Sequence, residues 1–255
     1  MKISVITATY NSAKTIPEII ECIQQQSFPD IEWIVVDGKS SDNSVEILKK
    51  SNRLSRLISE TDRGIYDALN KGIQMATGDV IGFLHSDDLF ASSKTLDLIA
   101  HEFSVSENGK NNKIPDVVYG DLVFTALQDT NKIVRYWKSK TFKPSLLFRG
   151  WMPPHPTLFM RREVYGKHGF FNTNLRCASD YDYIIRVFQD ETLEKRYIPK
   201  VITKMRMGGT STGGIKKIIN KKREDYWVLR KNNMPFPFWI LMAKNFSKIH
   251  QLILK

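Results

Sequence analysis

Cysteine is scarce in this sequence, with 2 in 255 residues. Cys22 and Cys177 stand far apart, so they have no metal-site spacing, and one pair in a chain of this length is not a disulfide framework. The sequence also lacks an apolar run long enough to span a bilayer, and its first residues lack the architecture of a signal peptide. We therefore expect a cytoplasmic protein that touches a membrane only from the inner face.

Acidic residues are fewer than basic ones, with 27 Asp and Glu against 38 Lys and Arg, which gives a net charge of +11. Such a chain favours anionic partners, namely nucleic acid, phosphorylated substrates or an acidic membrane surface. The hydrophobic fraction of 42% is ordinary for a globular protein with a sizeable core.

Apolar segments alternate with helical patterns through the first 90 residues. We expect helices between strands at residues 3–8, 31–37, 57–58 and 80–84. This order predicts an α/β fold with a mostly parallel sheet and helices on both faces. Because the crossovers are right-handed, all these strands point the same way. Their ends then meet at one edge, where open α/β sheets bind ligands. The ends are residues 9–11, Asp37, residues 60–62 and Asp87–Asp88.

The second half of the sequence is less regular and predicts a smaller, antiparallel part. A strand is expected to follow the proline-rich loop GWMPPHPTLFMRR, and a helix to begin in ASDYDYIIRVF. Further strands are expected in DVVYGDLVF, KIVRYWK and KRYIPKVITKMRM, and a lysine-rich helix from 215 to about 232.

Asp87 and Asp88 are adjacent carboxylates at the end of a buried strand, where they repel each other and lose hydration. They either end the strand and cap a helix beginning near Ser92, or hold a divalent cation. Carboxylate oxygens suit Mg²⁺ or Mn²⁺, which bind through one or two carboxylates plus substrate phosphates. The convergence with Asp37 favours the metal site.

Three segments in order, ISVITATYNSAKTI, WIVVDGKSSDNS and NKGIQMATGDVIGFLHSDD, resemble family 2 glycosyltransferases of the GT-A fold. They also resemble the bacterial enzymes that build O-antigen, capsule or exopolysaccharide on a lipid carrier. The resemblance is strong over residues 1–90 and extends to about 210. It implies a catalytic domain over 1–210, with a nucleotide and metal half (1–90) and an acceptor half (91–210), followed by basic C-terminal helices (211–255).

The resemblance assigns residues to the sugar-nucleotide donor. Asp37 would bond the base, usually uracil. The other residues assigned to the nucleotide-sugar pocket are Thr9, Tyr10, Asn11, Ser40, Asp62, Arg63, Asn70, Lys71, Ser86 and Asp87. In HSDD the usual first aspartate of the family's Asp-x-Asp motif is His85, so the direct metal ligand is Asp87 in one register and Asp88 in the other. His85 would itself be an acceptable ligand for Mn²⁺, or else a hydrogen-bonded histidine at a strand end.

Asp180 and Asp182 lie two residues apart and cannot share one helix face. Both would also interact favourably with a helix N-terminus. The family has Glu-Asp at this place, with the aspartate as catalytic base, and Ser179-Asp180 matches it with serine for glutamate. The resemblance therefore assigns Asp180 as the base that takes the proton of the acceptor hydroxyl.

Two further groups are candidates for acceptor and phosphate contacts. Trp151 and His155 would form a platform for the acceptor sugar, or else belong to a packed core loop. Arg206 and the loop at 208–211 would cover the diphosphate, since cationic and N–H donors stabilise a leaving phosphate, or form a surface hinge.

The C-terminal region is basic and amphipathic, with the run KKIINKKRED followed by a tail rich in Phe, Trp, Ile and Lys. It suits an interfacial helix on anionic lipid, or a helix packed on the catalytic domain. The apolar residues of the tail are Phe238, Ile240, Leu241, Phe246, Ile249, Leu252 and Ile253.

The resemblance and the residues together predict an inverting hexosyltransferase that uses Mn²⁺ or Mg²⁺. It would move Glc, Gal, GlcNAc or a similar hexose from a UDP-sugar to a saccharide on a lipid carrier. A nucleotidyltransferase is disfavoured because TATYNSAKT contains no glycine for a phosphate loop. A nucleic-acid-binding protein lacks a recognised motif, so nucleic acid is not expected as a partner. A non-catalytic sugar-nucleotide binder is a further alternative, in which Asp180 would be dispensable.

Overall fold

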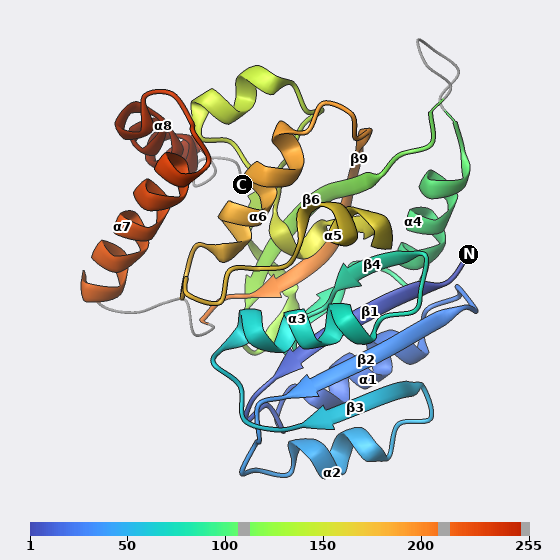
Figure 1. The fold of residues 1–255 in the computed structure, drawn as a ribbon. Helices are drawn as coiled ribbons and strands as arrows, with labels where there is room; N and C mark the ends of the chain where they lie inside the picture. The colour runs from blue at the N-terminus through green and yellow to red at the C-terminus, as the bar shows by residue number, and fades with distance from the viewer. Residues whose placement is uncertain (107–112, 209–214, 251–255) are drawn as a thin grey trace.

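The computed structural model describes residues 1–106, 113–208 and 215–250. Within these residues a nine-stranded sheet forms the centre, with helices on both faces (Figure 1). The strands are β1 (Ile3–Thr9), β2 (Ile31–Asp37), β3 (Leu54–Ser59), β4 (Val80–Phe83), β5 (Asp88–Phe90), β6 (Val117–Ala126), β7 (Asp129–Trp137), β8 (Phe159–Arg161) and β9 (Lys195–Arg206). The helices are α1 (Ile16–Gln24), α2 (Ser44–Lys49), α3 (Ile65–Met75), α4 (Thr95–Ser104), α5 (Arg162–His168), α6 (Ser179–Gln189), α7 (Ile215–Lys231) and α8 (Pro237–His250), with 3-10 turns η1 (Pro144–Arg149) and η2 (His155–Thr157).

The strand order is β3-β2-β1-β4-β8-β6-β9-β5, and β7 pairs with β6. Strands β1 to β4 are mutually parallel, as their apolar sequences and helical crossovers predict. Strands β8, β5 and β7 run antiparallel to their neighbours, and each antiparallel pair includes at least one strand that follows residue 116. The predicted mostly parallel sheet with an antiparallel part is confirmed. Both predicted halves contribute to this one sheet, while the boundary predicted near 210 falls at 209–214, outside the described residues.

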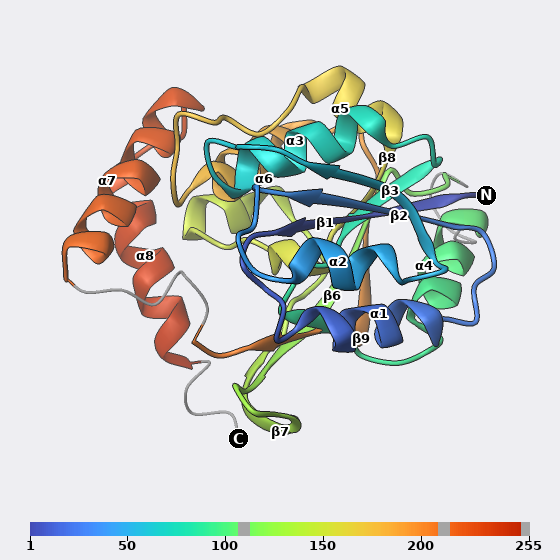
Figure 2. The same cartoon turned by 90° about the horizontal axis from the view of Figure 1, so that it is seen from below.

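Two apolar clusters hold the helices on the sheet. Figure 2 shows α3 and α5 above the sheet and α1 and α4 below it. The upper cluster joins apolar residues of β1, β2 and α3 to those of α6, and the lower one joins β1 and β2 to α1 and α4. Ile16, Ile19 and Ile23 of α1 are all buried because their spacing places them on one face of the helix. Burial on both faces explains why these strands are almost entirely apolar.

The segment after β4 differs from the expectation. Asp88 does not cap a helix: it begins the short strand β5, whose partner is β9, and it pairs with Met205. Helix α4 starts at Thr95 without a side-chain cap. The capping role predicted for Asp87 and Asp88 is therefore wrong.

Helices α7 and α8 pack against the rest of the chain through Val228, Leu229 and Ile240, which join the upper cluster. Lys244 of α8 pairs with Asp225 of α7 at 3.0 Å. The helix thus packs on the domain, which was one of the two alternatives for the tail. The side chains of Phe246 and Ile249, and residues Leu252 and Ile253, lie outside the described part of the structure. Within the described residues, none of the helices combines the length and the apolar composition needed to cross a bilayer.

Candidate active site

The loops that follow β1 and β2 form one rim at the carboxyl edge of the sheet. Thr9 and Asp37 are register partners at the ends of the two strands. The N–H of Asn11 donates to Ser40 Oγ at 2.8 Å, and Asn11 Oδ1 accepts the N–H of Ser41 at 2.9 Å. Asn11 has a φ of +50°, a left-handed conformation that asparagine tolerates better than most residues. The side chain of Asn11 therefore holds the rim together.

Asp37 is fully buried beneath this rim. Its Oδ2 accepts the N–H of Ser40 at 2.9 Å and the hydroxyl of Ser59 at 2.7 Å, and its Oδ1 accepts the hydroxyl of Ser40. Both carboxylate oxygens are thus used by groups of the protein. These bonds fix the conformation of the loop, and the contact of Asp37 and Ser40 with a nucleotide stays a prediction.

Gly38 separates a carboxylate from an aromatic ring on the same rim. A Cβ at Gly38 would lie 2.6 Å from Asp62 Oδ2 and 3.4 Å from Cδ2 of Tyr10, so the glycine allows both side chains to approach its backbone. The Tyr10 side chain is 64% exposed. Asp62 Oδ1 accepts the N–H of Gly64 at 2.8 Å, which leaves Oδ2 on the side of Gly38.

The acidic pair lies deeper in the same edge. Asp87 is half-buried, whereas Asp88 is fully buried, and neither carboxylate oxygen of Asp88 has a hydrogen-bond partner among the described residues. Burial raises the pKa of Asp88 well above its usual value; the charge of Asp87 raises it further and Arg206 lowers it. A buried carboxyl without partners is costly, so these oxygens suit a cation.

His85 adds a neutral nitrogen beside the acidic pair. Burial lowers its pKa, although Asp87 and Asp180 act in the opposite direction, and Nδ1 is buried with no partner among the residues described. The described residues contain no group of three or more His, Cys, Asp or Glu side chains that could hold a metal ion. A cation here would therefore draw further ligands from a phosphate or from water, as Mg²⁺ usually does.

Ser86 and Arg206 anchor the acidic loop. Ser86 Oγ and Ser12 Oγ are 3.0 Å apart, which links the loop to the rim after β1. Arg206 is buried, donates to the Asp87 carbonyl at 3.5 Å and pairs with Glu18 of α1. Arg206 thus contacts the backbone of the acidic loop and helix α1, and its positive charge partly offsets the negative charge of Asp88. Of the loop predicted to work with it, residues 209–211 are outside the described residues.

Asp180, in the first turn of α6, lies near this acidic loop. Its Oδ1 accepts the hydroxyl of Tyr66 at 3.3 Å, and its charge acts on both His85 and His155. The His155 ring stacks on Phe83, with centroids 5.3 Å apart. Burial lowers the pKa of His155 to about 4, and its Nε2 has no partner among the described residues. A half-buried carboxylate, two neutral imidazoles and an acidic pair are therefore grouped together.

Known proteins match this chain over much of its length. Residues 4–108 match the model of the family described as Glycosyl transferase family 2. A "PGL/p-HBAD biosynthesis glycosyltransferase" of Mycobacterium bovis (strain BCG / Pasteur 1173P2) is 33% identical over 203 residues, which cover 78% of this chain and 74% of that protein. The chain belongs to glycosyltransferase family 2.

Solved structures share the fold of this family 2 glycosyltransferase. S. aureus TarS 1-349 in complex with UDP-GlcNAc gives a TM-score of 0.68 at 20% identity, covering 91% of this chain and 65% of that one. This chain therefore spans just under two thirds of that TarS chain. Mannosyltransferase PcManGT from Pyrobaculum calidifontis, in complex with GDP-Man and Mn²⁺, gives 0.65 at 20% identity and covers 99% and 72%. The GT-A fold predicted from the sequence is confirmed.

Asn70 and Lys71, two of the residues that the resemblance assigns to the donor, bond to other parts of the protein. The Asn70 amide exchanges two hydrogen bonds of 2.9 Å with the backbone of Phe171. Lys71 pairs with Glu60 at 2.8 Å and Asp67 at 3.6 Å. These contacts hold α3 in place, and the assignment of Asn70 and Lys71 to the nucleotide pocket stays a prediction. Arg63 remains exposed on the rim, where it also pairs with Asp67 at 3.2 Å.

The two aspartates of α6 have different surroundings. Asp182 is fully buried and accepts from Arg186 and Lys231, both at 3.2 Å, and from Asn232 at 2.9 Å. It therefore joins α6 to the end of α7. This arrangement agrees with the preference for Asp180 as the residue available to a ligand.

Trp151 packs in an aromatic cluster, with ring centroids 5.9 Å from those of Tyr119, Phe142 and Phe188. Trp151 therefore lies in a packed core loop, which was one of the two alternatives. A contact between Trp151 and the acceptor sugar stays a prediction. Sequence reasoning missed Tyr66, because its partner Asp180 lies 114 residues away and nothing local marks it.

Proposed function

We propose that this glycosyltransferase moves a hexose from a UDP-sugar to a hydroxyl of a lipid-linked saccharide, with inversion, in the synthesis of a bacterial surface polysaccharide. One observation carries the proposal: the charges of Asp180 and Asp87 both act on His85, so the α6 carboxylate lies near the acidic pair Asp87–Asp88. A base for the acceptor and ligands for the donor diphosphate are needed on the two sides of the reacting carbon. The complex of TarS with UDP-GlcNAc supports the choice of nucleotide.

The base of the donor would lie against Tyr10 and Asp62. An exposed aromatic ring offers a stacking surface, and Asp62 Oδ2 offers one acceptor beside Gly38. Uracil presents a single N3–H along this edge, whereas guanine presents an N–H and an amino group together. Because Asp62 Oδ1 already accepts the Gly64 N–H, one remaining acceptor suits uracil better.

The candidate ligand for Mn²⁺ or Mg²⁺ is the carboxylate of Asp87 or of Asp88, with the imidazole of His85 as a further candidate, and the donor diphosphate and water would complete the set. The orphaned oxygens of Asp88 support this choice, as does the complex of PcManGT with Mn²⁺. When bound, the cation would supply charge neutralisation for the departing nucleoside diphosphate. Arg206, behind the pair, would limit their mutual repulsion before the donor arrives.

Asp180 would act as the general base. Its carboxylate takes the proton of the acceptor hydroxyl, whose oxygen attacks the anomeric carbon as the bond to the diphosphate breaks on the opposite face. Tyr66 orients the carboxylate by donating its hydroxyl hydrogen. His155 is neutral at physiological pH, and its Nε2 could hold a hydroxyl of the acceptor sugar. General base catalysis of this kind contributes about 10²- to 10⁴-fold.

Calorimetric titration of UDP, GDP and CDP, each with and without Mn²⁺, tests the donor site. We expect UDP to bind with Mn²⁺ present and to lose most of its affinity in Asp87→Ala or Asp88→Ala. Asp180→Asn should keep UDP binding and lose transfer, measured with a panel of UDP-hexoses. If the folded protein binds no nucleotide with the metal present, the proposal is wrong. Equal transfer by Asp180→Asn and the unchanged protein would remove Asp180 as the base.

A further inference from the structure

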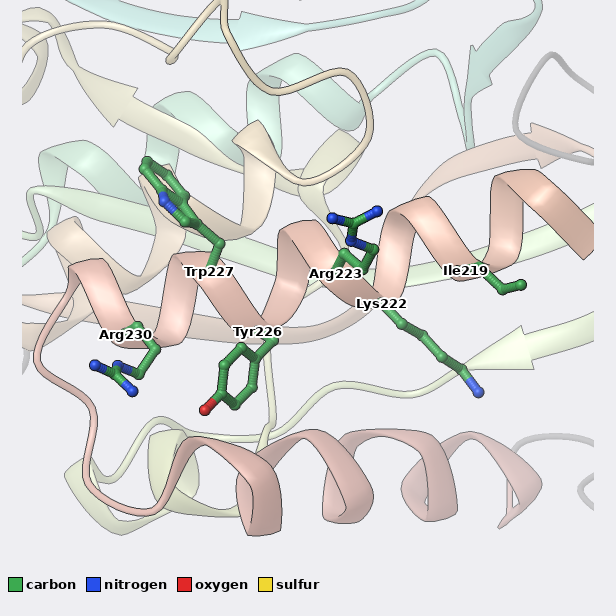
Figure 3. Close-up of a pocket in the computed structure, with 6 residues that line it drawn as sticks. All are labelled: Ile219, Lys222, Arg223, Tyr226, Trp227 and Arg230. Atoms are coloured by element: carbon green, nitrogen blue, oxygen red, sulfur yellow. The ribbon is translucent and has the colours of Figure 1, made fainter.

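One side of α7 carries a stripe of cations and aromatic rings away from the active site. Ile219 and Trp227 of this stripe are 52% and 47% exposed. The residues of the α7 stripe line a cavity of about 700 Å³ (Figure 3): Ile219, Lys222, Arg223, Tyr226, Trp227 and Arg230. Their spacing of three or four residues keeps them together along the helix.

The acidic residues in the described part of α7 turn inward. Glu224 accepts the backbone N–H groups of Arg176, Cys177 and Ala178, at 2.8 to 3.1 Å. Asp225 is buried and pairs with Lys244 of α8. The positive charge of the α7 stripe is therefore not balanced by acids of its own helix.

An aromatic elbow adjoins α7 where the chain turns into α8. We define it as Phe148, Phe236, Phe238 and Trp239, which are 52%, 75%, 60% and 70% exposed. A second hollow, of about 390 Å³, is lined by Phe148, Pro235, Phe236, Trp239 and Ile240. Phe236 has a φ of +51°, which is an outlier for a bulky residue. The fold thus keeps the large apolar side chain of Phe236 exposed although its backbone conformation is unfavourable. Residues with such strained backbones are found preferentially at functional sites.

We propose that the α7 stripe and the aromatic elbow dock this enzyme on an anionic lipid bilayer. Charge complementarity selects this occupant, because the stripe presents cations to acidic headgroups, while Trp and Phe side chains insert at the level of the headgroups. The surface differs in part from the amphipathic tail expected from the sequence. Phe238 of that tail belongs to the elbow, whereas Ile240 is buried in the structure.

The docking surface lies close to the catalytic base. Glu224, on α7, bonds to the N–H of Ala178, two residues before Asp180. Figures 1 and 2 both show α7 and α8 on the side of the molecule to which β1, β2 and β3 point. A bilayer bound there would present a lipid-linked acceptor to Asp180. This last step rests on the proposed function; the docking itself does not.

Sedimentation with vesicles tests the docking surface. The full chain should bind vesicles of phosphatidylcholine with phosphatidylglycerol, bind pure phosphatidylcholine more weakly, and lose affinity as salt rises. Two variants, Lys222→Glu/Arg223→Glu and Phe236→Ser/Trp239→Ser, should each bind at least about tenfold more weakly. Matched controls are Lys49→Glu/Lys50→Glu, exposed on α2, and Leu127→Ser/Ile133→Ser, 59% and 57% exposed at the β6–β7 hairpin. Both controls should bind like the unchanged protein.

Three outcomes would overturn the docking proposal. The unchanged protein could fail to bind anionic vesicles at low salt, or the stripe and elbow variants could bind as tightly as the controls. Alternatively, the unchanged protein could form a dimer in sedimentation velocity without binding vesicles, and the elbow substitutions could convert this dimer to a monomer. A titration of UDP with Mn²⁺ on the same preparations separates the two proposals. Vesicle binding without nucleotide binding keeps the docking surface and rejects the proposed donor.

Discussion

Replacing Gly38 by alanine tests how the donor base is recognised. The substitution adds a methyl group between Tyr10 and Asp62, where a Cβ would lie 2.6 Å from Asp62 Oδ2 and 3.4 Å from Cδ2 of Tyr10. The second distance is an ordinary contact, and the first is a clash. Gly38 does not have a positive φ, so alanine meets no backbone strain there.

The size of the effect follows from these distances. Asp62 Oδ2 must retreat by about 0.8 Å to reach ordinary contact, a shift that would break a hydrogen bond made at the present position. A hydrogen bond to a charged group contributes about 1.5–3 kcal/mol, so UDP should bind roughly 10- to 100-fold more weakly. The free energy of unfolding should change by less than about 1 kcal/mol, because the clashing atom ends a flexible, partly exposed side chain.

Calorimetry of UDP in the presence of Mn²⁺ measures this loss. Gly166→Ala on α5 is the matched control, since a Cβ there would meet nothing within 4 Å, and it should leave the UDP affinity unchanged. Asp62→Ala should weaken UDP to a similar degree. In the Asp62→Ala background, Gly38→Ala should cost nothing further, because the two changes remove the same interaction.

The reasoning fails if Gly38→Ala binds UDP within about twofold of the unchanged protein while remaining folded. It fails equally if Gly38→Ala and Asp62→Ala weaken UDP independently, because the glycine would then act through some other group. In either case Asp62 would not read the base.

Three further predictions concern buried or half-buried ionisable groups. Asp182→Asn should lower the free energy of unfolding by about 2 kcal/mol, measured by urea titration. This cost is smaller than that of breaking a fully buried ion pair, because the side chains of Arg186 and Lys231 are 22% and 39% exposed. Asp190 is desolvated, but hydrogen bonds from Lys167, Thr192 and His168 outweigh this and hold its pKa below 3.8. Its contribution to stability should thus be fully present at neutral pH and diminish progressively as the pH falls below about 4, so that the cost of Asp190→Asn, about 1–2 kcal/mol at pH 7, becomes smaller as the solution is acidified; a cost that stays constant down to about pH 2 would contradict this. Burial raises the pKa of Cys22 to about 11, so mass spectrometry should find it unmodified by iodoacetamide at pH 8 in the native protein and modified in urea.

Much of the fold was predictable because its strands are buried on both faces. Runs such as those of β1 and β2 are apolar throughout, and helical spacing between them indicates crossovers, so order and direction follow from the sequence. Strand β5 was not predictable: it has three residues, too few for any period, and it begins with Asp88. Its existence depends on pairing with β9, more than a hundred residues later.

The active site was predictable where a residue's position matters and less so where its partners matter. The sheet topology brings the ends of β1 and β2 together, and these could be found from strand ends alone. The bonding of Asp37 to Ser40 and Ser59, and of Asn70 to Phe171, depends on side-chain conformation and on residues distant in the sequence. The same limit applies to Asp62, whose importance depends on the absence of a side chain at Gly38.

The position of β8 in the sheet has a consequence for synthesis on the ribosome. Strand β4 pairs with β1 on one side and with β8 on the other. At roughly 5–20 residues per second, the residues of β8 emerge several seconds after those of β4. During that interval the β1–β4 sheet has an apolar, unpaired edge at Val80–Phe83, which is a template for pairing with another chain. Nascent chains on neighbouring ribosomes are thus most prone to associate before residue 161 has emerged.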